Sequence, residues 1–276
     1  KRHEVRVLAR DPERAKRELN VAAAYRWDGA KELPPIEALA GADAVVNLAG
    51  ASVAGKRWSP EYKKAILDSR VLTTRALVEA IAKAQRKPQV LVNASAVGYY
   101  GGRGDEVLEE SAGPGADFLA DVVSRWEAEA QRASIRSVQV RTGIVLSAQG
   151  GALEKMLPPF KAFVGGPIGS GKQWFPWIHI ADEVAAIAWC IDSDLTGAVN
   201  LAAPGIVTMK EFAKALGRVL HRPSWAPVPA APLRILLGEF ASALLEGQRA
   251  VPRKLLDSGF RFRFSDVDSA LRDLFA

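Results

Sequence analysis

Short apolar runs alternate with longer amphipathic segments through the first half of the chain. Four runs are apolar enough to predict strands covered on both faces, over residues 4–9, 44–47, 89–93 and 137–142. Between them the pattern predicts helices over 60–83, with Pro60 in the first turn, and over 118–132. Strands that alternate with helices predict an α/β fold with a doubly wound parallel sheet.

The pattern changes after residue 150, where Gly and Pro become frequent before the chain turns mainly helical. Thr208 and Glu211 have the spacing of a capping box ahead of a helix. We therefore expect an α/β domain over 1–150 and a small, mainly helical C-terminal lobe over 151–276. Some segments of the lobe are expected to return to the sheet, and the two parts to pack around a cleft.

Charge and cysteine content narrow the function classes. The net charge is +6, but basic and acidic residues are interspersed, so we do not expect nucleic-acid binding. A positive balance does favour a phosphorylated ligand. The single Cys190 lies in an apolar helical run and fits core packing in a reducing compartment. No apolar stretch reaches the ~18 residues of a membrane span, and we expect a cytoplasmic protein.

The first predicted strand ends in Arg10, and Asp11 and Pro12 then open a helix. In a dinucleotide-binding unit, the residue that ends the second strand faces the adenosine ribose. An acid there binds the 2′-hydroxyl, whereas an arginine accepts a 2′-phosphate. Arg10 therefore predicts NADP as the cofactor. Arg14, one turn later, either adds a second charge or is simply solvated.

The strand and glycine-rich turn that hold the pyrophosphate in such a unit have no counterpart in the sequence. That strand lies in the middle of a doubly wound sheet, so without it two neighbouring strands have unpaired backbone groups. We expect about 20 further residues before Lys1 in the natural protein. For the chain as written, we expect weak cofactor binding or none.

Several motifs together resemble the extended short-chain dehydrogenases/reductases, which have a Rossmann-type fold. They lie at residues 47–50 (Asn-Leu-Ala-Gly), 69–74, 94–101, 141–146 and 177–182. The resemblance is strongest to the branch of epimerase family proteins, related to nucleotide-sugar epimerases. Its marks are the segments 165–171, 175–179 and 244–249, and it runs essentially from Lys1 to Ala276.

The resemblance implies a set of cofactor contacts. The small residues of the Asn47, Leu48, Ala49 and Gly50 turn would let the cofactor approach the backbone, and Arg70 would reach it from the long helix. Ser95 would lie beside the nicotinamide. By resemblance alone, Gly143, Ile144 and Val145 form a loop whose backbone meets the nicotinamide carboxamide.

Catalysis in the superfamily uses Ser, Tyr and Lys, and here the match is incomplete. Ser95 matches the serine, but Phe118 and Val122 stand at the positions of the Tyr-x-x-x-Lys pair. Tyr99 or Tyr100 is then a candidate substitute acid, unless both only wall the nicotinamide pocket.

Two functions stay open at this point. One is an NADP-dependent oxidoreductase or epimerase that acts on a small polar substrate such as a sugar nucleotide. The other is a non-catalytic NADP(H)-binding regulatory protein. The protein is also a candidate homodimer.

Two other motifs have structural explanations. His179 and Asp182 resemble an acid/base or metal pair, but a buried strand histidine followed by a helix cap explains them, with Asp182 as the cap of a helix from Glu183. With three histidines and one cysteine, we expect no metal site. Residues 166–173 nearly spell a P-loop, but Gln173 stands where Ser or Thr should bind magnesium. We expect this loop to edge the substrate cleft.

Overall fold

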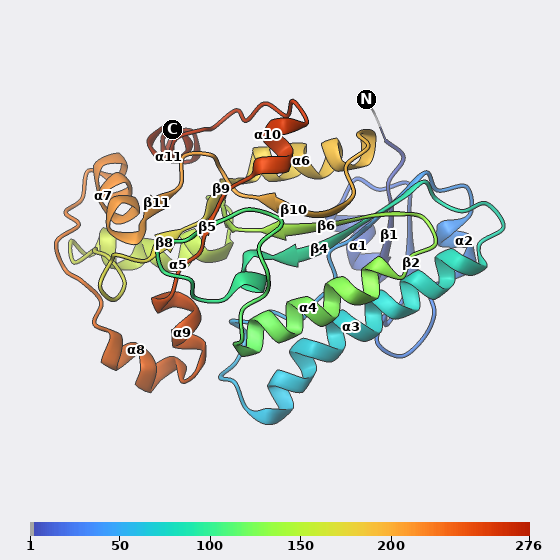
Figure 1. The fold of residues 1–276 in the computed structure, drawn as a ribbon, viewed down its shortest axis with the longest axis horizontal. Coiled ribbons are helices and arrows are strands. Elements are labelled where there is room, and N and C mark those ends of the chain that lie inside the picture. The colour runs from blue at the N-terminus through green and yellow to red at the C-terminus, as the bar shows by residue number, and fades with distance from the viewer. Residues whose placement is uncertain (1–2) are drawn as a thin grey trace.

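The main sheet has four parallel strands in the order β10-β6-β4-β3, with helices on both faces (Figure 1). The computed structural model describes residues 3–276. The sheet strands are β3 (Ala44–Asn47), β4 (Val90–Ala96), β6 (Arg136–Thr142) and β10 (Gly197–Leu201). In the ladder, Val92 pairs with Val46 on one side and Val138 on the other. This architecture confirms the predicted fold class.

Alternate side chains of the sheet enter two different cores. Leu91 packs with Leu77 and Ile81 of α3 (Pro60–Lys83) and with residues of α4 (Phe118–Gln131). Val92 packs on the other face with Cys190 of α6 (Ile180–Asp192), and burial raises the pKa of the Cys190 thiol to about 12. The period of two along the strand therefore explains why helices cover both faces.

The α3 and α4 boundaries follow from their caps. The Ser59 hydroxyl accepts the Tyr62 amide at the start of α3, and Asp117 accepts the Ala120 amide at the start of α4. The predicted helix over 60–83 is confirmed with the same bounds, and the helix over 118–132 ends one residue earlier.

A second parallel pair precedes the main sheet. β1 (Arg6–Ala9) pairs with β2 (Ala23–Arg26), and α1 (Pro12–Glu18) connects them, with Asp11 as its N-cap. Among residues 3–276, β1 pairs only with β2, and β3 only with β4. Val46 of β3 is 40% exposed, and none of the four β1 residues is buried. The expectation that every strand is covered on both faces is therefore wrong for β1 and β3. The short α2 (Ile36–Leu39) precedes β3 in the chain, and a 3-10 turn (Val97–Tyr100) directly follows β4.

The C-terminal lobe has its own core, centred on Phe160, Phe212 and Leu271. Its helices are α5 (Gly151–Lys161), α7 (Met209–Leu220), α8 (Ala230–Leu237), α9 (Phe240–Leu245), α10 (Arg253–Asp257) and α11 (Val267–Phe275). The remaining strands are β5 (Val107–Leu108), β7 (Ile144–Leu146), β8 (Trp174–Phe175), β9 (Trp177–His179), β11 (Val207–Thr208) and β12 (Arg249–Ala250). The Thr208–Glu211 capping box is present at the start of α7. No helix in the described part of the chain is long and apolar enough to cross a membrane.

Candidate functional site

The carboxyl ends of β3, β4 and β6 lie along one edge of the sheet because the strands are parallel. Polar side chains gather there in place of the apolar residues that precede them, and Asn47, Asn93, Ser95 and Arg141 are all buried. Ligands in doubly wound folds bind outside this edge, which makes it the candidate site.

The turn after β3 is held by hydrogen bonds to buried residues on one side and is exposed to solvent on the other. The Asn47 amide donates to Asn93 Oδ1 at 2.6 Å and to Thr74 Oγ1 at 3.0 Å, and its own oxygen accepts the Ala49 amide at 3.2 Å. Leu48 is 65% exposed, although it is a large apolar residue, and Gly50 is also exposed. The sequence-predicted turn 47–50 is thus a rigid, solvent-facing surface.

Arg70 supports the same turn from α3. Its guanidinium donates to the Ala51 and Ile66 carbonyls at 2.9 and 3.1 Å and lies 5.1 Å from the Trp126 ring centroid. Burial lowers the pKa of Arg70. A Cβ at Gly50 would lie 3.0 Å from Arg70 Cζ, so the turn leaves little room for a side chain here.

Arg10 lies exposed just after β1. Its charge interacts with Asp28, but within residues 3–276 its guanidinium makes no hydrogen bond or ion pair. Arg14 differs, because it pairs with Glu18 at 2.8 Å. Of Arg10 and Arg14, only Arg10 has a guanidinium without a partner in residues 3–276.

Ser95 points into a buried ion pair. Its hydroxyl donates to Glu127 Oε1 at 2.5 Å. Arg141 binds the same carboxylate through two nitrogens, each at 2.8 Å, and both charged residues are only 3% exposed. Burial lowers the pKa of Arg141, but the hydrogen bonds and charge of Glu127 outweigh it and raise the pKa overall. The Ser95 hydroxyl is therefore engaged inside the protein.

The two adjacent tyrosines have different surroundings. The Tyr100 hydroxyl donates to Asn200 Oδ1 at 2.7 Å and accepts from Arg141 at 3.0 Å, and the residue is fully buried. Burial raises the pKa of Tyr100. The Tyr99 ring is partly exposed and centred 3.5 Å from Arg141 Cζ, and its hydroxyl has no partner among the described residues. The geometry therefore argues against Tyr100 as an acid and leaves Tyr99 as the candidate.

Residues 143–145 do not form the expected loop. Ile144 and Val145 belong to β7, which pairs with β9 in the register Ile144–Trp177. The Gly143 amide donates to the Leu201 carbonyl at 2.9 Å and the Ile144 amide to the Pro176 carbonyl at 2.6 Å. A Cβ at Gly143 would lie 2.2 Å from the Pro176 oxygen, so close packing explains this glycine. The amides of Gly143 and Ile144 therefore donate within the protein and are not available to a nicotinamide carboxamide.

His179 and Asp182 have structural roles, but the cap was assigned to the wrong residue. Helix α6 begins at Ile180, and His179 Nδ1 accepts the Ala181 amide at 3.1 Å. Asp182 instead accepts the amides of Arg263 and Phe264 at 2.8 and 2.9 Å. Its carboxylate thereby ties the sheet edge to the C-terminal segment.

Glu183 is a buried acid beside the end of β6. Its Oε1 accepts the Thr142 hydroxyl at 2.8 Å, whereas Oε2 is buried without a partner in residues 3–276. Burial raises the pKa of Glu183 to about 7, although the Thr142 hydrogen bond opposes the shift.

A pocket of about 470 Å³ has a lining that begins at residue 102, two residues after Tyr100 in the chain. It is lined by residues 102–103 and 114–117 and by Glu246. The Gly115 amide donates to the Tyr99 carbonyl at 2.8 Å, which joins the pocket wall to the tyrosine pair. The glycine-rich segment contacts α9, because Gln173 donates to the Ile168 and Leu244 carbonyls, and its place at the substrate cleft stays a prediction.

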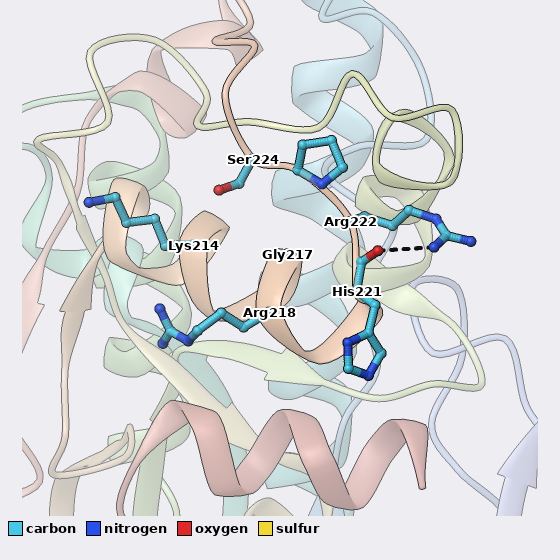
Figure 2. Close-up of a pocket in the computed structure, with 7 residues that line it drawn as sticks. Lys214, Gly217, Arg218, His221, Arg222 and Ser224 are labelled. Atoms are coloured by element: carbon cyan, nitrogen blue, oxygen red, sulfur yellow. Dashed lines mark hydrogen bonds between the residues drawn. The ribbon is translucent and has the colours of Figure 1, made fainter.

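A second hollow of about 430 Å³ lies at the end of α7 (Figure 2). Its basic side chains, including Lys214, Arg218 and Arg222, diverge in the close-up, and they converge on no common point. Arg218 is neutralised by Asp268 at 2.8 Å, and Arg222 lies 4.5 Å from the Phe163 ring centroid. This arrangement does not form an anion site.

Sequence reasoning missed the Glu127–Arg141 pair and Glu183. A usable signal exists for the pair, because each is a charged residue inside an otherwise apolar element: Arg141 in a buried strand and Glu127 beside Trp126 and Ala130 on a helix face. Glu183 gives no such signal, since acids are common in the first turn of a helix.

Comparisons with known proteins show similarity along nearly the whole chain. The model of the NAD dependent epimerase/dehydratase family matches residues 1–202, and a domain of unknown function (DUF1731) matches 228–274. The epimerase family protein SDR39U1 homolog, chloroplastic, of Arabidopsis thaliana is 42% identical over 98% of this chain and 79% of its own length. Epimerase family protein YfhF of Bacillus subtilis is 39% identical over 99% of this chain and 90% of its own. The crystal structure of human epimerase family protein SDR39U1 with NADPH superposes with a TM-score of 0.88 and 36% identity, covering 99% of this chain and 90% of that one.

Proposed function

The chain belongs to the NAD dependent epimerase/dehydratase family, and on that premise we propose that it binds NADPH and acts as an oxidoreductase or epimerase on a small polar carbonyl or sugar substrate. The observation that carries the choice of NADPH is the guanidinium of Arg10, exposed after β1 and without a hydrogen bond in the described part of the chain. The human relative named above was crystallised with NADPH.

The residues at the sheet edge fit a dinucleotide. The 47–50 turn is rigid and exposed, and Gly50 leaves a cradle that a Cβ would narrow against Arg70. Arg10 would accept the 2′-phosphate, because a guanidinium binds phosphate through paired hydrogen bonds. When bound, the reduced nicotinamide supplies a hydride. The chain's own residues must then supply the proton.

Tyr99 is the residue we assign to the proton. Its hydroxyl is unpartnered within residues 3–276 and is therefore available to donate a proton to a substrate oxygen. Ser95 would orient a substrate oxygen only after its hydroxyl left Glu127.

A second candidate function is a regulatory NADPH-binding protein without turnover. It is favoured by Val122, which stands at the expected lysine position and is 1% exposed in the core. Restoring that lysine is not a useful test, because Val122→Lys would bury an unpaired ammonium. Consumption of NADPH with a carbonyl substrate, and its loss in a Tyr99 variant, separates the two functions.

Fluorescence titration of the full-length protein with NADPH and NADH tests the cofactor assignment. We expect Arg10→Ala to weaken NADPH binding by roughly tenfold or more, the loss of a charge-assisted contact, and to leave NADH binding unchanged. Arg14→Ala is the matched control, since Arg14 is exposed but paired with Glu18. Equal affinity of the unaltered protein for both nucleotides would contradict the role of Arg10.

A further inference from the structure

Helix α9 lies near the starts of α3 and α4 (Figure 1). Three aromatic rings from these three segments contact one another there. Trp58 precedes α3, Phe118 begins α4 and Phe240 begins α9. The Trp58 ring centroid lies 5.0 Å from that of Phe118 and 5.5 Å from that of Phe240. The Trp58 indole nitrogen donates to the Val53 carbonyl at 2.8 Å, which fixes the ring. The three rings, all partly exposed, form one apolar wall.

Lys63 places an ammonium against this wall. Its Nζ lies 4.8 Å from the Phe118 centroid and 5.8 Å from the Trp58 centroid, within the range of cation–π attraction. The same Nζ pairs with Glu239 Oε2 at 2.5 Å. The side chains of Lys63 and Glu239 are 28% and 51% exposed, so the pair borders solvent.

An ion pair this exposed contributes little to stability, roughly 0–1 kcal/mol. It is therefore a weak connection between the lobes, and an anion carried by a ligand can replace Glu239 at small cost. The buried Arg141–Glu127 pair is different, because at 3% exposure its partners cannot exchange with a ligand. Of these two pairs, only Lys63–Glu239 is available for binding.

The wall and the 470 Å³ pocket are built on the same two elements. Asp117, which lines the pocket, directly precedes Phe118, and Glu246, which also lines it, directly follows α9. The pocket lining and the wall are therefore joined through consecutive residues at the start of α4. Lys63 brings one ammonium to the wall, and one positive charge matches a ligand with a single negative charge better than a dianion such as phosphate.

We propose that this wall binds the flat apolar part of a small carboxylate ligand, an aryl monocarboxylate, whose carboxylate displaces Glu239 from Lys63. The rings supply stacking surface and the ammonium supplies the charge. The inference rests on the proposed function only in taking the ligand to be its substrate, and it narrows the substrate class.

Binding of 4-methylbenzoate and its neutral analogue 4-methylbenzamide, measured by calorimetry on the full-length protein with NADP⁺ present, tests the proposal without requiring turnover. We expect the carboxylate to bind several-fold more tightly than the amide. Lys63→Met should weaken carboxylate binding by about tenfold and remove the preference, whereas Glu239→Gln should strengthen it several-fold. Lys64→Met is the matched control, because Lys64 pairs with Asp68 on the exposed face of α3 and should change nothing.

The proposal requires Lys63→Met to weaken carboxylate binding and Glu239→Gln to strengthen it. Glu239 is exposed, so we expect its variant to fold. No measurable carboxylate binding at about 10 mM, or the same sign for both variants, overturns the proposal. NADPH affinity of the same proteins separates this result from the proposed function. Intact NADPH binding without the Lys63 effect refutes the aryl carboxylate site alone, and absent NADPH binding refutes the cofactor assignment.

Discussion

Tyr99 and Tyr100 are neighbours in sequence, yet Arg141 uses them differently. It faces the ring of Tyr99 and donates a hydrogen bond to the hydroxyl of Tyr100. The Tyr99 hydroxyl therefore stays available for proton transfer. The Tyr100 hydroxyl is instead used in buried hydrogen bonds that stabilise the fold. The sequence predicts a tyrosine pair at this edge but not which member is free, because that depends on Asn200, about a hundred residues away.

The two tyrosines should therefore give opposite phenotypes when each is changed to Phe. We expect Tyr99→Phe to lower turnover by about a hundredfold or more, the usual contribution of a general acid, with NADPH affinity retained. Tyr100→Phe should cost about 1–3 kcal/mol of unfolding free energy, since Asn200 and Arg141 lose a buried partner. Steady-state kinetics and urea unfolding measure the two effects, and exchanged phenotypes would contradict the assignment.

Glu183 should make stability depend on pH. Its pKa is about 7 in the folded protein and near 4.5 when unfolded, so folding retains a proton that the unfolded chain releases. The contribution of Glu183 to stability is therefore fully present below about pH 4.5 and is lost as the pH rises towards 7, by at most about 3 kcal/mol. Glu183→Gln should stabilise the protein at pH 8 and have little effect at pH 5.

Urea unfolding at both pH values checks this expectation, with Glu37→Gln as the control because Glu37 is exposed on α2. A Glu183→Gln protein whose stability changes equally at pH 5 and pH 8 would show that this carboxylate is not the source.

At the level of elements, boundaries were predictable where a cap or a buried run marks them. Ser59-Pro60 starts α3, and the apolar run at 44–47 is β3. β2 was missed, because Ala23–Arg26 is short and only partly buried. The 143–145 segment was misread as a loop, since β7 depends on pairing with β9 more than thirty residues later. Pairing over such separations leaves no local pattern.

Helix α8 is weakly attached to the rest of the protein. It has no buried residue, and Ile235 and Leu236 are 76% and 73% exposed. Helix α7 buries Phe212 and Leu216 completely. Because opening α8 exposes little apolar surface, its amides should exchange with solvent well before those of α7. Hydrogen exchange followed by mass spectrometry checks this, and equal protection of the two helices would indicate that another surface covers α8.

For the whole molecule, the two lobes share a border and are not independent units. The Rossmann sheet takes β10 from beyond residue 150, and Asp182 binds amides of residues 263 and 264. The family match ends at residue 202, whereas we predicted a division at 150 from the change in pattern, and that division stays a prediction. So does the homodimer. The site was predictable as a sheet edge, but the part contributed by Glu239 and Phe240 was not, because it comes from the other lobe.

The guanidinium of Arg141 also donates to the Glu110 carbonyl at 3.2 Å, so one side chain anchors both the tyrosine pair and the far end of the segment that borders the pocket. The pocket rim at Gly102 and Arg103 thus lies between fixed points set by the protein interior. Arg103, whose side chain pairs with Glu106 in the same loop, can therefore change over evolution without disturbing the framework beneath it. Such a layout lets ligand preference diversify among descendants of one ancestor while the scaffold itself stays constant.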